Sequence, residues 1–525
     1  MKRLFWILVL TACCLPLQAQ VQRLSTMRRN AEKIARALYY VENHYVDTLD
    51  MDKVIDKMLE GLMEQLDPHS AYIPQARVEE TNEPLDGSFE GVGIEFTLLT
   101  DTLIIQSVIA GGPSEAVGIR PGDRIVAVDG EPIAGVGMTT DGIRSRLRGP
   151  KGTKVTVTIL RGDQLQDFVI RRDTIPIESV DAAYNPEPGI VYIRLGRFAQ
   201  RSAEDFLEAL AKTAPRRPDG IIIDLRGNGG GFMHVATILA DMFLEKGQTI
   251  VRTEGSGINH EDVASGQGLY KEGPLVVMVD ESSASASEIL AGALQDWDRA
   301  VIVGRRTFGK GLVQRQYELP DGSEMRLTVA RYHTPSGRVV QAPYEPGQRE
   351  AYYKQAQLRY EHGESFSRDS IVLPDSLQFK TLKLGRTVYG GGGIMPDVFV
   401  PYDTTGFNAF FVRVVGSGLL SEYSYDYIDK HRKELQVKDI DAFLKCWDKI
   451  GAEAFDGLIE YCREKGQVPG EEELAECEAV LRTRLKALLA RSALGTTGYW
   501  QVINREEDPA FQQALEVIRN WPEVF

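Results

Sequence analysis

The residues best suited to chemistry lie in the middle of the chain. Ser285 stands in a run of serines and alanines before an apolar stretch, and Lys310 follows 25 residues later between two glycines. A serine hydroxyl must lose a proton before it attacks a carbonyl, and lysine can take that proton if burial lowers its pKa. The pattern therefore predicts Ser285 as nucleophile and Lys310 as base, with Gln314 placed to orient the amine.

The same serine also has a structural explanation. Ser285-Ala286-Ser287-Glu288 is a capping box, in which the serine would only satisfy backbone amides of the helix that follows. Two features favour the nucleophile hypothesis: the interleaved alanines leave room at the backbone, and the strand predicted after the helix ends beside Lys310. No Ser-His-Asp arrangement is apparent among the seven histidines.

A glycine-rich loop is the second candidate site. A buried strand is predicted at 220–225, and it runs into Gly-Asn-Gly-Gly-Gly at 227–231. Glycines tolerate positive φ and let backbone amides approach a ligand closely, but the Lys-Ser/Thr pair of a phosphate-binding loop is missing. We expect the amides of Ala286 and of Gly230 or Gly231 to face the oxyanion that forms when a carbonyl is attacked.

The elements that must position these residues alternate between strand and helix after Pro176. This order predicts right-handed crossovers and a partly parallel sheet, so we predict an α/β core over residues 176–405. A helical segment is predicted before it at 20–80 and a helical region after it at 406–525. His69 follows the first helices in a turn, where a structural role is expected.

Residues 82–175 show a different pattern, with short strands and glycine turns. The segments at 111–116, 118–123 and 128–130 together resemble a PDZ domain of the bacterial type. In such a domain a Gly-rich strand entry holds a carboxylate and the strand edge pairs with an extended peptide. The resemblance implies a binding site for protein C-termini at Gly91, Val92, Gly93, Ile94 and Phe96.

Together, these segments resemble the C-terminal processing peptidases, which are tail-specific serine endopeptidases with a Ser/Lys dyad and a PDZ domain. The similarity spans residues 30 to 400 and is most specific at 283–296 and 307–314. It implies a crotonase- or Clp-like peptidase core, Ser285 as nucleophile, Lys310 as general base and Gln314 as its hydrogen-bonding partner. It also implies protein or peptide substrates with free C-termini, no cofactor and no metal, and assembly as a homodimer through terminal segments.

One departure from the family is an insertion. The family's Gly-Ile-x-Pro-Asp segment, here at 393–397, arrives only after a charged, tyrosine-rich stretch at 342–391. This stretch could shape access to the dyad, bind a partner or form a surface excursion, and the last is the default for a long connection.

The N-terminus predicts export. Lys2 and Arg3 precede an apolar run, and Leu17-Gln18-Ala19 resembles a cleavage site. Residues 1–19 are therefore predicted to be a secretory signal, and the protein is predicted to be periplasmic or associated with the cell envelope. Leu-Thr-Ala-Cys, ending at Cys13, also resembles a lipoprotein box, which would leave a lipidated cysteine at the membrane. The soluble exported form is preferred because a complete cleavage site follows.

Composition limits the partners. The formal charge is -15, which argues against nucleic acid, because phosphate binding needs clustered Lys and Arg. Cys446, Cys462 and Cys477 have no paired spacing, so neither a disulfide framework nor a zinc site is predicted.

Two other functions remain open. One is a non-catalytic PDZ adaptor on a degenerate peptidase core, which the presence of Ser285, Lys310 and Gln314 argues against. The other is a crotonase-like acyl transferase, which would bind coenzyme A and would give the PDZ-like region no role.

Overall fold

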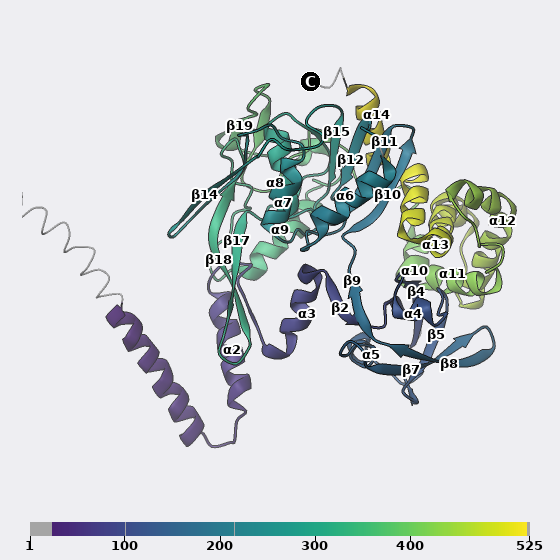
Figure 1. The fold of residues 1–525 in the computed structure, drawn as a ribbon, viewed down its shortest axis with the longest axis horizontal. Helices are drawn as coiled ribbons and strands as arrows, with labels where there is room; N and C mark the ends of the chain where they lie inside the picture. The colour runs from purple at the N-terminus through teal and green to yellow at the C-terminus, as the bar shows by residue number, and fades with distance from the viewer. Residues whose placement is uncertain (1–23, 100, 215, 522–525) are drawn as a thin grey trace, which may run out of the picture.

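The computed structural model describes residues 24–99, 101–214 and 216–521. Three regions are visible in Figure 1: an α/β core, a small strand-rich region below it, and a helical region beside the latter. The predicted signal at 1–19, including Cys13, lies outside the described residues. Among the residues that are described, no helix has both the length and the apolar character needed to cross a membrane.

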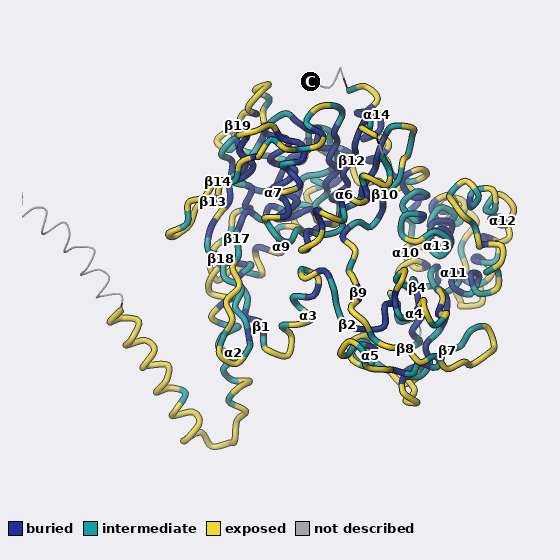
Figure 2. Tube along the Cα trace, viewed as in Figure 1, coloured by how far each residue is buried: buried dark blue, intermediate teal, exposed yellow. Residues whose placement is uncertain are grey.

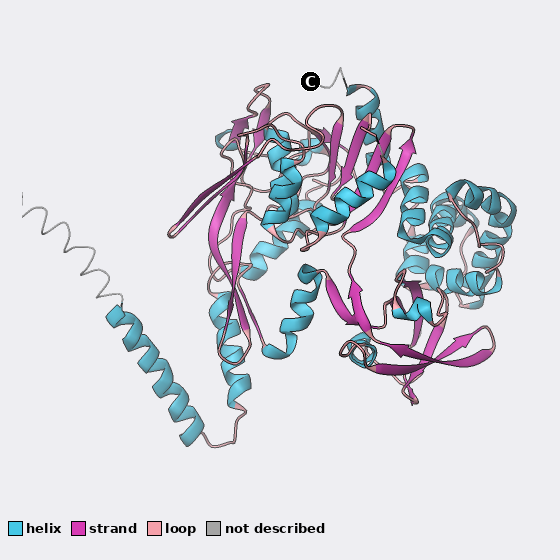
Figure 3. Ribbon diagram, viewed as in Figure 1, coloured by secondary structure: helices cyan, strands magenta, loops and turns pink. Residues whose placement is uncertain are grey.

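The core is built on a six-stranded sheet of order β10-β11-β12-β15-β16-β21 (Figure 3). Only β10 and β11 pair in antiparallel fashion, and the remaining neighbours are parallel. The strands are β10 (Val180–Glu187), β11 (Ile190–Leu195), β12 (Gly220–Asp224), β15 (Leu275–Val279), β16 (Val301–Gly304) and β21 (Val398–Phe399).

Helices cover both faces of this sheet, which is why β12 and β15 are continuous apolar runs, buried along their whole length. On one face lie α6 (Ser202–Thr213), α7 (Met233–Asp241) and α8 (Ala286–Asp296). On the other lies α14 (Pro509–Arg519), the last helix of the chain. The predicted 406–525 region is therefore divided, because α14 leaves the helical region and packs on the core.

A second sheet lies against the core, and Lys310 lies just before one of its strands. Its order is β1-β18-β13-β14, with β17 also paired to β18. The strands are β1 (Ala71–Ile73), β13 (Thr249–Gly255), β14 (Ile258–Val263), β17 (Leu312–Glu318) and β18 (Glu324–His333). The N-terminal segment is thus not only helical: after a helix at 24–44 and α2 (Met51–Glu64), it contributes β1 to this sheet.

The strand-rich region is a sheet of order β3-β4-β5-β7-β8, with β6 beside β5. A two-stranded ribbon of β2 (Ser88–Gly91) and β9 (Asp173–Pro176) joins it to the core, and α3 (Gln75–Asp86) precedes that ribbon. The remaining elements are β3 (Ile94–Leu99), β4 (Thr102–Val108), α4 (Pro113–Ala116), β5 (Arg124–Val128), β6 (Glu131–Pro132), α5 (Thr140–Leu147), β7 (Lys154–Arg161) and β8 (Gln164–Arg171).

The helical region has its own apolar core and contacts the strand-rich region through Ile104. It consists of α10 (Ala409–Gly416), α11 (Leu419–Lys430), α12 (Ile440–Glu464) and α13 (Glu471–Glu506), the last kinked at Gly495. Cys462 and Cys477 are buried there as free thiols, and Cys446 is a partly exposed free thiol.

The insertion at 342–391 is folded. It contains α9 (Arg349–Glu361), the short helices η1 (Arg368–Ser370) and η2 (Asp375–Leu377), and the hairpin of β19 (Gln378–Lys380) and β20 (Thr387–Tyr389).

Candidate active site

Ser285 lies at the point where the chain turns from β15 into α8. Its backbone has φ 56° and ψ -113°, whereas a helix N-cap is normally extended. A serine at positive φ is strained, and such strain persists where the surrounding structure enforces it, commonly at functional sites. The capping-box residues are both present, but this conformation sets Ser285 apart from an ordinary cap.

Lys310 lies just before β17 and is tied to Gln314. Its Nζ donates to Gln314 Oε1 at 3.0 Å, and Gln314 Nε2 donates to the backbone carbonyl of His69. Burial lowers the pKa of the Lys310 amine, and the nearby charge of Arg326 lowers it further. An amine with a lowered pKa can serve as a base nearer neutral pH.

Glu288 joins the serine segment to the lysine segment. Its Oε2 accepts the backbone N–H groups of Ser285 at 2.9 Å and Lys310 at 2.8 Å. Its Oε1 accepts the Thr307 hydroxyl at 2.6 Å and the Gly309 N–H at 2.7 Å. The side chain is fully buried, and that burial raises its pKa.

Glu288 was predicted only as part of a capping box, so its contacts with the lysine segment were missed. The available signal was an acid within the helix 286–296, every residue of which is buried. A carboxylate in that setting needs several donors.

Tyr332, on β18, also contacts both of these segments. Its hydroxyl donates to the backbone carbonyls of Lys310 and, at 3.2 Å, of Ser285. Among the hydrogen bonds of the described residues, none joins the Ser285 and Lys310 side chains directly; the Lys310 amine is bonded to Gln314 instead. Proton transfer between Ser285 and Lys310 stays a prediction.

The glycine loop lies directly against the serine. A Cβ added to Gly230, which has φ +100°, would be 2.8 Å from Ser285 Cβ and 2.9 Å from the amide nitrogen of Ala286. The Gly230 N–H donates to Asn228 Oδ1 at 2.9 Å, so it is already occupied. This leaves Gly231, which is at φ +147° and held beside Phe198, as the stronger candidate donor with Ala286.

His69, for which a structural role was predicted, lies at the site and contacts residues around Lys310. Its Nε2 lies 3.1 Å from the Tyr352 hydroxyl, and its carbonyl holds Gln314. Burial, with help from the charge of Lys310, lowers the pKa of His69 to about 4. The imidazole is therefore neutral over the range in which most enzymes work.

The insertion packs on the lysine segment and is not a surface excursion. Arg359 of α9 donates to the carbonyls of Thr307 at 2.9 Å and Arg306 at 3.0 Å. Tyr352 of the same helix is buried and donates to the Gly309 carbonyl at 3.3 Å. The helix therefore packs against the segment that carries Lys310.

Two cavities lie at the two ends of α9. One, of about 440 Å³, adjoins the serine side and is lined by Ala284, Phe308, Arg359 and Tyr360 among others. The other, of about 500 Å³, is lined by Lys310 and Gln314 together with residues of α2, α3, β18 and α9.

Of the residues predicted to bind a C-terminus, Ile94 and Phe96 lie on the outer strand of the strand-rich region, and Gly91, Val92 and Gly93 precede it. Strand β3 is the end strand of its sheet in the described chain, so its outer edge is open to an added strand. Gly93 has φ +75°, and Ile94 and Phe96 lie on β3. Val92 is buried and its carbonyl accepts from Ser114, so its side chain packs in the core of the region. Gly91 ends β2.

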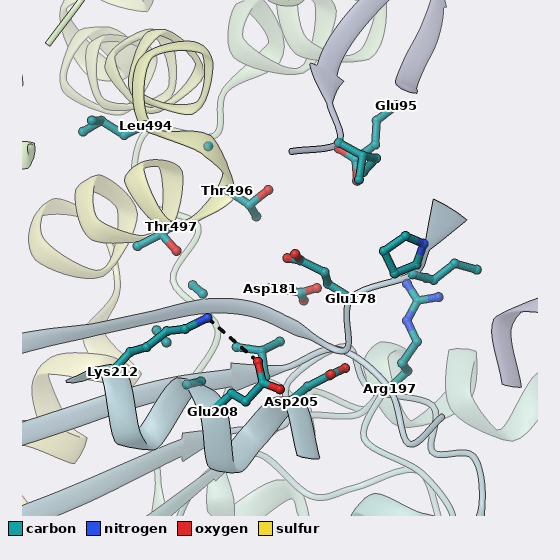
Figure 4. Close-up of a pocket in the computed structure, with 18 of the residues that line it drawn as sticks. Glu95, Glu178, Asp181, Arg197, Asp205, Glu208, Lys212, Leu494, Thr496 and Thr497 are labelled. Carbon is teal, nitrogen blue, oxygen red and sulfur yellow. Dashed lines mark ion pairs between the residues drawn. The ribbon is translucent and has the colours of Figure 1, made fainter. Parts of the chain in front are cut away.

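A third cavity, of about 530 Å³, adjoins this strand at the junction with the core (Figure 4). Its lining includes Ile94 and Glu95 from β3, and Glu178 and Asp181 from the core. Within the described chain, no group of His, Cys, Asp and Glu side chains is arranged to hold a metal ion.

Comparison with known proteins places the chain in a family. Residues 189–346 match "Peptidase family S41", residues 104–161 match "PDZ domain", and residues 410–495 match a "Family of unknown function (DUF8443)".

Two similar relatives come from Bacillus subtilis (strain 168). "Carboxy-terminal processing protease CtpA" is 34% identical over 318 residues, which cover 60% of this chain and 68% of the relative. "Carboxy-terminal processing protease CtpB" is 34% identical over 327 residues, 61% of this chain and 68% of the relative.

Among solved structures, a "Photosystem II D1 C-terminal processing protease" is 27% identical, with a TM-score of 0.36 over 69% of this chain and 85% of that one. The family match and the two relatives identify the chain as a member of peptidase family S41, a serine-type peptidase with a PDZ domain, similar to the carboxy-terminal processing proteases.

Proposed function

We propose that this peptidase is exported, binds the C-termini of protein substrates on the edge of β3, and cleaves peptide bonds with Ser285 and Lys310. The observation that carries the proposal is the Lys310 amine: it is buried, its pKa is lowered, and Gln314 holds it at 3.0 Å. Burying an amine costs free energy, and a role as a base is a reason for a protein to keep such a group.

The reaction uses only groups of this chain. Lys310 Nζ takes the proton of the Ser285 hydroxyl as Oγ attacks the substrate carbonyl, and the amides of Ala286 and Gly231 face the resulting oxyanion. When the tetrahedral intermediate collapses, Lys310 gives the proton to the leaving amine and an ester to Ser285 remains. Water hydrolyses that ester by the same route and restores both side chains.

Two observations support capture of a peptide by strand addition. Strand β3 presents an unpaired edge within the described residues, and Gly93 at its entry adopts the positive φ that lets amides point at a carboxylate. The cavity beside Ile94 and Glu95 lies between this edge and the core, where a bound tail would pass.

Assembly as a homodimer through the N-terminal helix is part of the proposal. Residues 24–44 form a helix that extends away from the core and is coloured as exposed along most of its length (Figure 2). Leu24, Met27 and Ile34 are 61%, 71% and 47% exposed. Exposed apolar side chains gathered on one helix are typical of an interface. Membrane attachment through Cys13 and an envelope location follow from the N-terminal pattern alone.

The test is hydrolysis of an unstructured protein by wild type and Ser285→Ala. The proposal expects cleavage by wild type and a loss of at least about a thousandfold in the variant. Equal, near-zero turnover by both would support the non-catalytic adaptor instead. Removal of the last residues of the substrate tests PDZ capture, because it should lower kcat/KM for wild type.

A further inference from the structure

The cavity beside Lys310 collects arginines from three separate elements. Arg77 comes from α3, Arg326 from β18 and Arg349 from the first turn of α9, and all three line the cavity with Lys310 and Gln314. Arginine side chains gathered around one space are the usual means of binding a carboxylate, because the guanidinium fork matches its two oxygens.

These arginines stand out because other arginines nearby are paired. Arg306 and Arg359 both bind Glu364, and Arg305 binds Glu281. In the described chain none of the cavity's three arginines forms an ion pair: Arg326 donates to Asn82 Oδ1 at 2.8 Å, and Arg349 lies over the Tyr353 ring.

Arg326 is the most informative of the three. It is partly buried, and that burial lowers its pKa, as expected of a cation without a bound carboxylate. The positive charge of Arg326 also lowers the pKa of Lys310. The charges of Lys310 and Arg349 in turn lower the pKa of His69. The cavity therefore carries a positive potential on its inner side.

The acids near this cavity offset only part of that potential. Glu60 and Glu64 line it from α2, but Glu60 already pairs with Lys57 at 2.6 Å. Asp67 lies outside the lining, accepts hydrogen bonds from the Ser70 and Thr328 hydroxyls and from the backbone amides of His69 and Ser70, and raises the pKa of Lys310 by its charge. Glu324, on β18, likewise raises the pKa of Arg326, but burial outweighs it.

We infer that this cavity is a substrate subsite that binds a carboxylate of the peptide being cleaved. The inference rests on the proposed function, because it places the carboxylate next to the base that acts on the scissile bond. The carboxylate has two possible sources with the same chemistry, an acidic side chain near the scissile bond or the C-terminal carboxylate of a short tail.

The experiment measures kcat/KM for matched peptides. One set carries Asp or Asn at each successive position on both sides of a single cleavage site, and a second set ends in a free acid or an amide. The proteins compared are wild type, Arg349→Gln and Arg326→Gln, and the control is Arg315→Gln. The control removes the same charge from an exposed residue of β17, whose side chain points to the opposite face of the strand from Gln314.

We expect wild type and Arg315→Gln to prefer one Asp peptide over its Asn partner by about tenfold, the value of one charge-assisted hydrogen bond. Arg349→Gln and Arg326→Gln should lose most of that preference. If the two variants lose instead a preference for the free acid over the amide, the carboxylate bound in the cavity is the C-terminus of the substrate. A preference for the free acid that comes from PDZ binding would survive in both variants.

Equal kcat/KM for all peptides with wild type, at normal turnover of the neutral peptide, would overturn the subsite and leave the proposed function intact. Absence of turnover of every peptide by wild type would overturn the proposed function and the subsite with it.

Discussion

Glu288 Oε2 accepts the backbone N–H of Lys310 at 2.8 Å, and the same oxygen accepts the N–H of Ser285 at 2.9 Å. One buried carboxylate thus fixes the backbone at both the proposed nucleophile and the proposed base. The distance between these two residues is set by a side chain that takes no part in the proton transfer. Glu288 is a positioning residue.

Glu288→Gln should lower kcat/KM by about a hundredfold with a small change in KM. The glutamine side chain keeps one accepting oxygen but turns an NH2 group toward backbone N–H groups that Glu288 accepts. The two backbone segments should then separate, because each buried N–H left without an acceptor costs about 1–3 kcal/mol. The negative charge of Glu288 raises the pKa of Lys310, so its loss should also move the acidic limb of the residual activity to lower pH. Glu204→Gln, on the exposed side of α6, is the control. Unchanged kcat and an unchanged limb would show that Glu288 has no part in positioning.

Gly230→Ala should abolish most activity, while Gly229→Ala should not. A Cβ at Gly230 would lie 2.7 Å from the Ala284 carbonyl and 2.8 Å from Ser285 Cβ, at φ +100°, whereas a Cβ at Gly229 meets nothing within 4 Å. The first change must displace the nucleophile or the oxyanion loop, and losing one oxyanion donor alone costs about a hundredfold in kcat. The measurement is kcat for both variants by steady-state kinetics, with circular dichroism to check that each variant is folded. Equal activity in both would mean that the loop does not touch the reaction.

The acidic limb of kcat/KM should move to higher pH in Arg326→Gln. Lys310 works as a base only when it is unprotonated, so activity falls as pH falls through its pKa, which burial and Arg326 lower. Removing the arginine raises that pKa and shifts the limb upward. A neutral, amidated peptide keeps substrate carboxylates out of the measurement, and Arg315→Gln serves as the matched charge change. A limb at the same pH in both variants would contradict the coupling.

His69 should make the protein less stable as pH falls from about 6.5 to about 4, because its pKa is about 4 in the folded protein and 6.5 for an ordinary histidine. In that window the unfolded chain binds a proton that the folded chain does not, so the stabilisation is fully present above the window and is lost below it. His69→Gln removes the titrating group and should flatten this part of the curve. Free energies of unfolding at several pH values measure the difference. Parallel curves for the two proteins would show that His69 is protonated in the fold.

The α/β core could be predicted because its signals are local, and the catalytic roles of Ser285 and Lys310 stay predictions drawn from equally local motifs. The apolar strands at 220–224 and 275–279 and the helix after Ser285 follow from periodicity, and the serine and lysine stand in short motifs. Glu288 was seen only as a cap, because four donors from separate segments meet it only in the fold.

The rest depends on contacts that sequence spacing does not contain. His69 reaches Gln314 across 245 residues, and Tyr352 of the insertion reaches His69 across 283. Likewise, α14 returns to the core after a helical region of its own and packs Phe511 and Leu515 on the sheet. Helical periodicity predicts such a helix but does not predict the surface on which it packs.

The most direct test of the account is hydrolysis of one unstructured protein by wild type and by Lys310→Met, which removes the amine and keeps much of the side chain's apolar volume. The account predicts a fall in kcat/KM of about a thousandfold, within the range of general base catalysis, while the folded structure and PDZ binding are retained. Hydrolysis by Lys310→Met at the wild-type rate would contradict it.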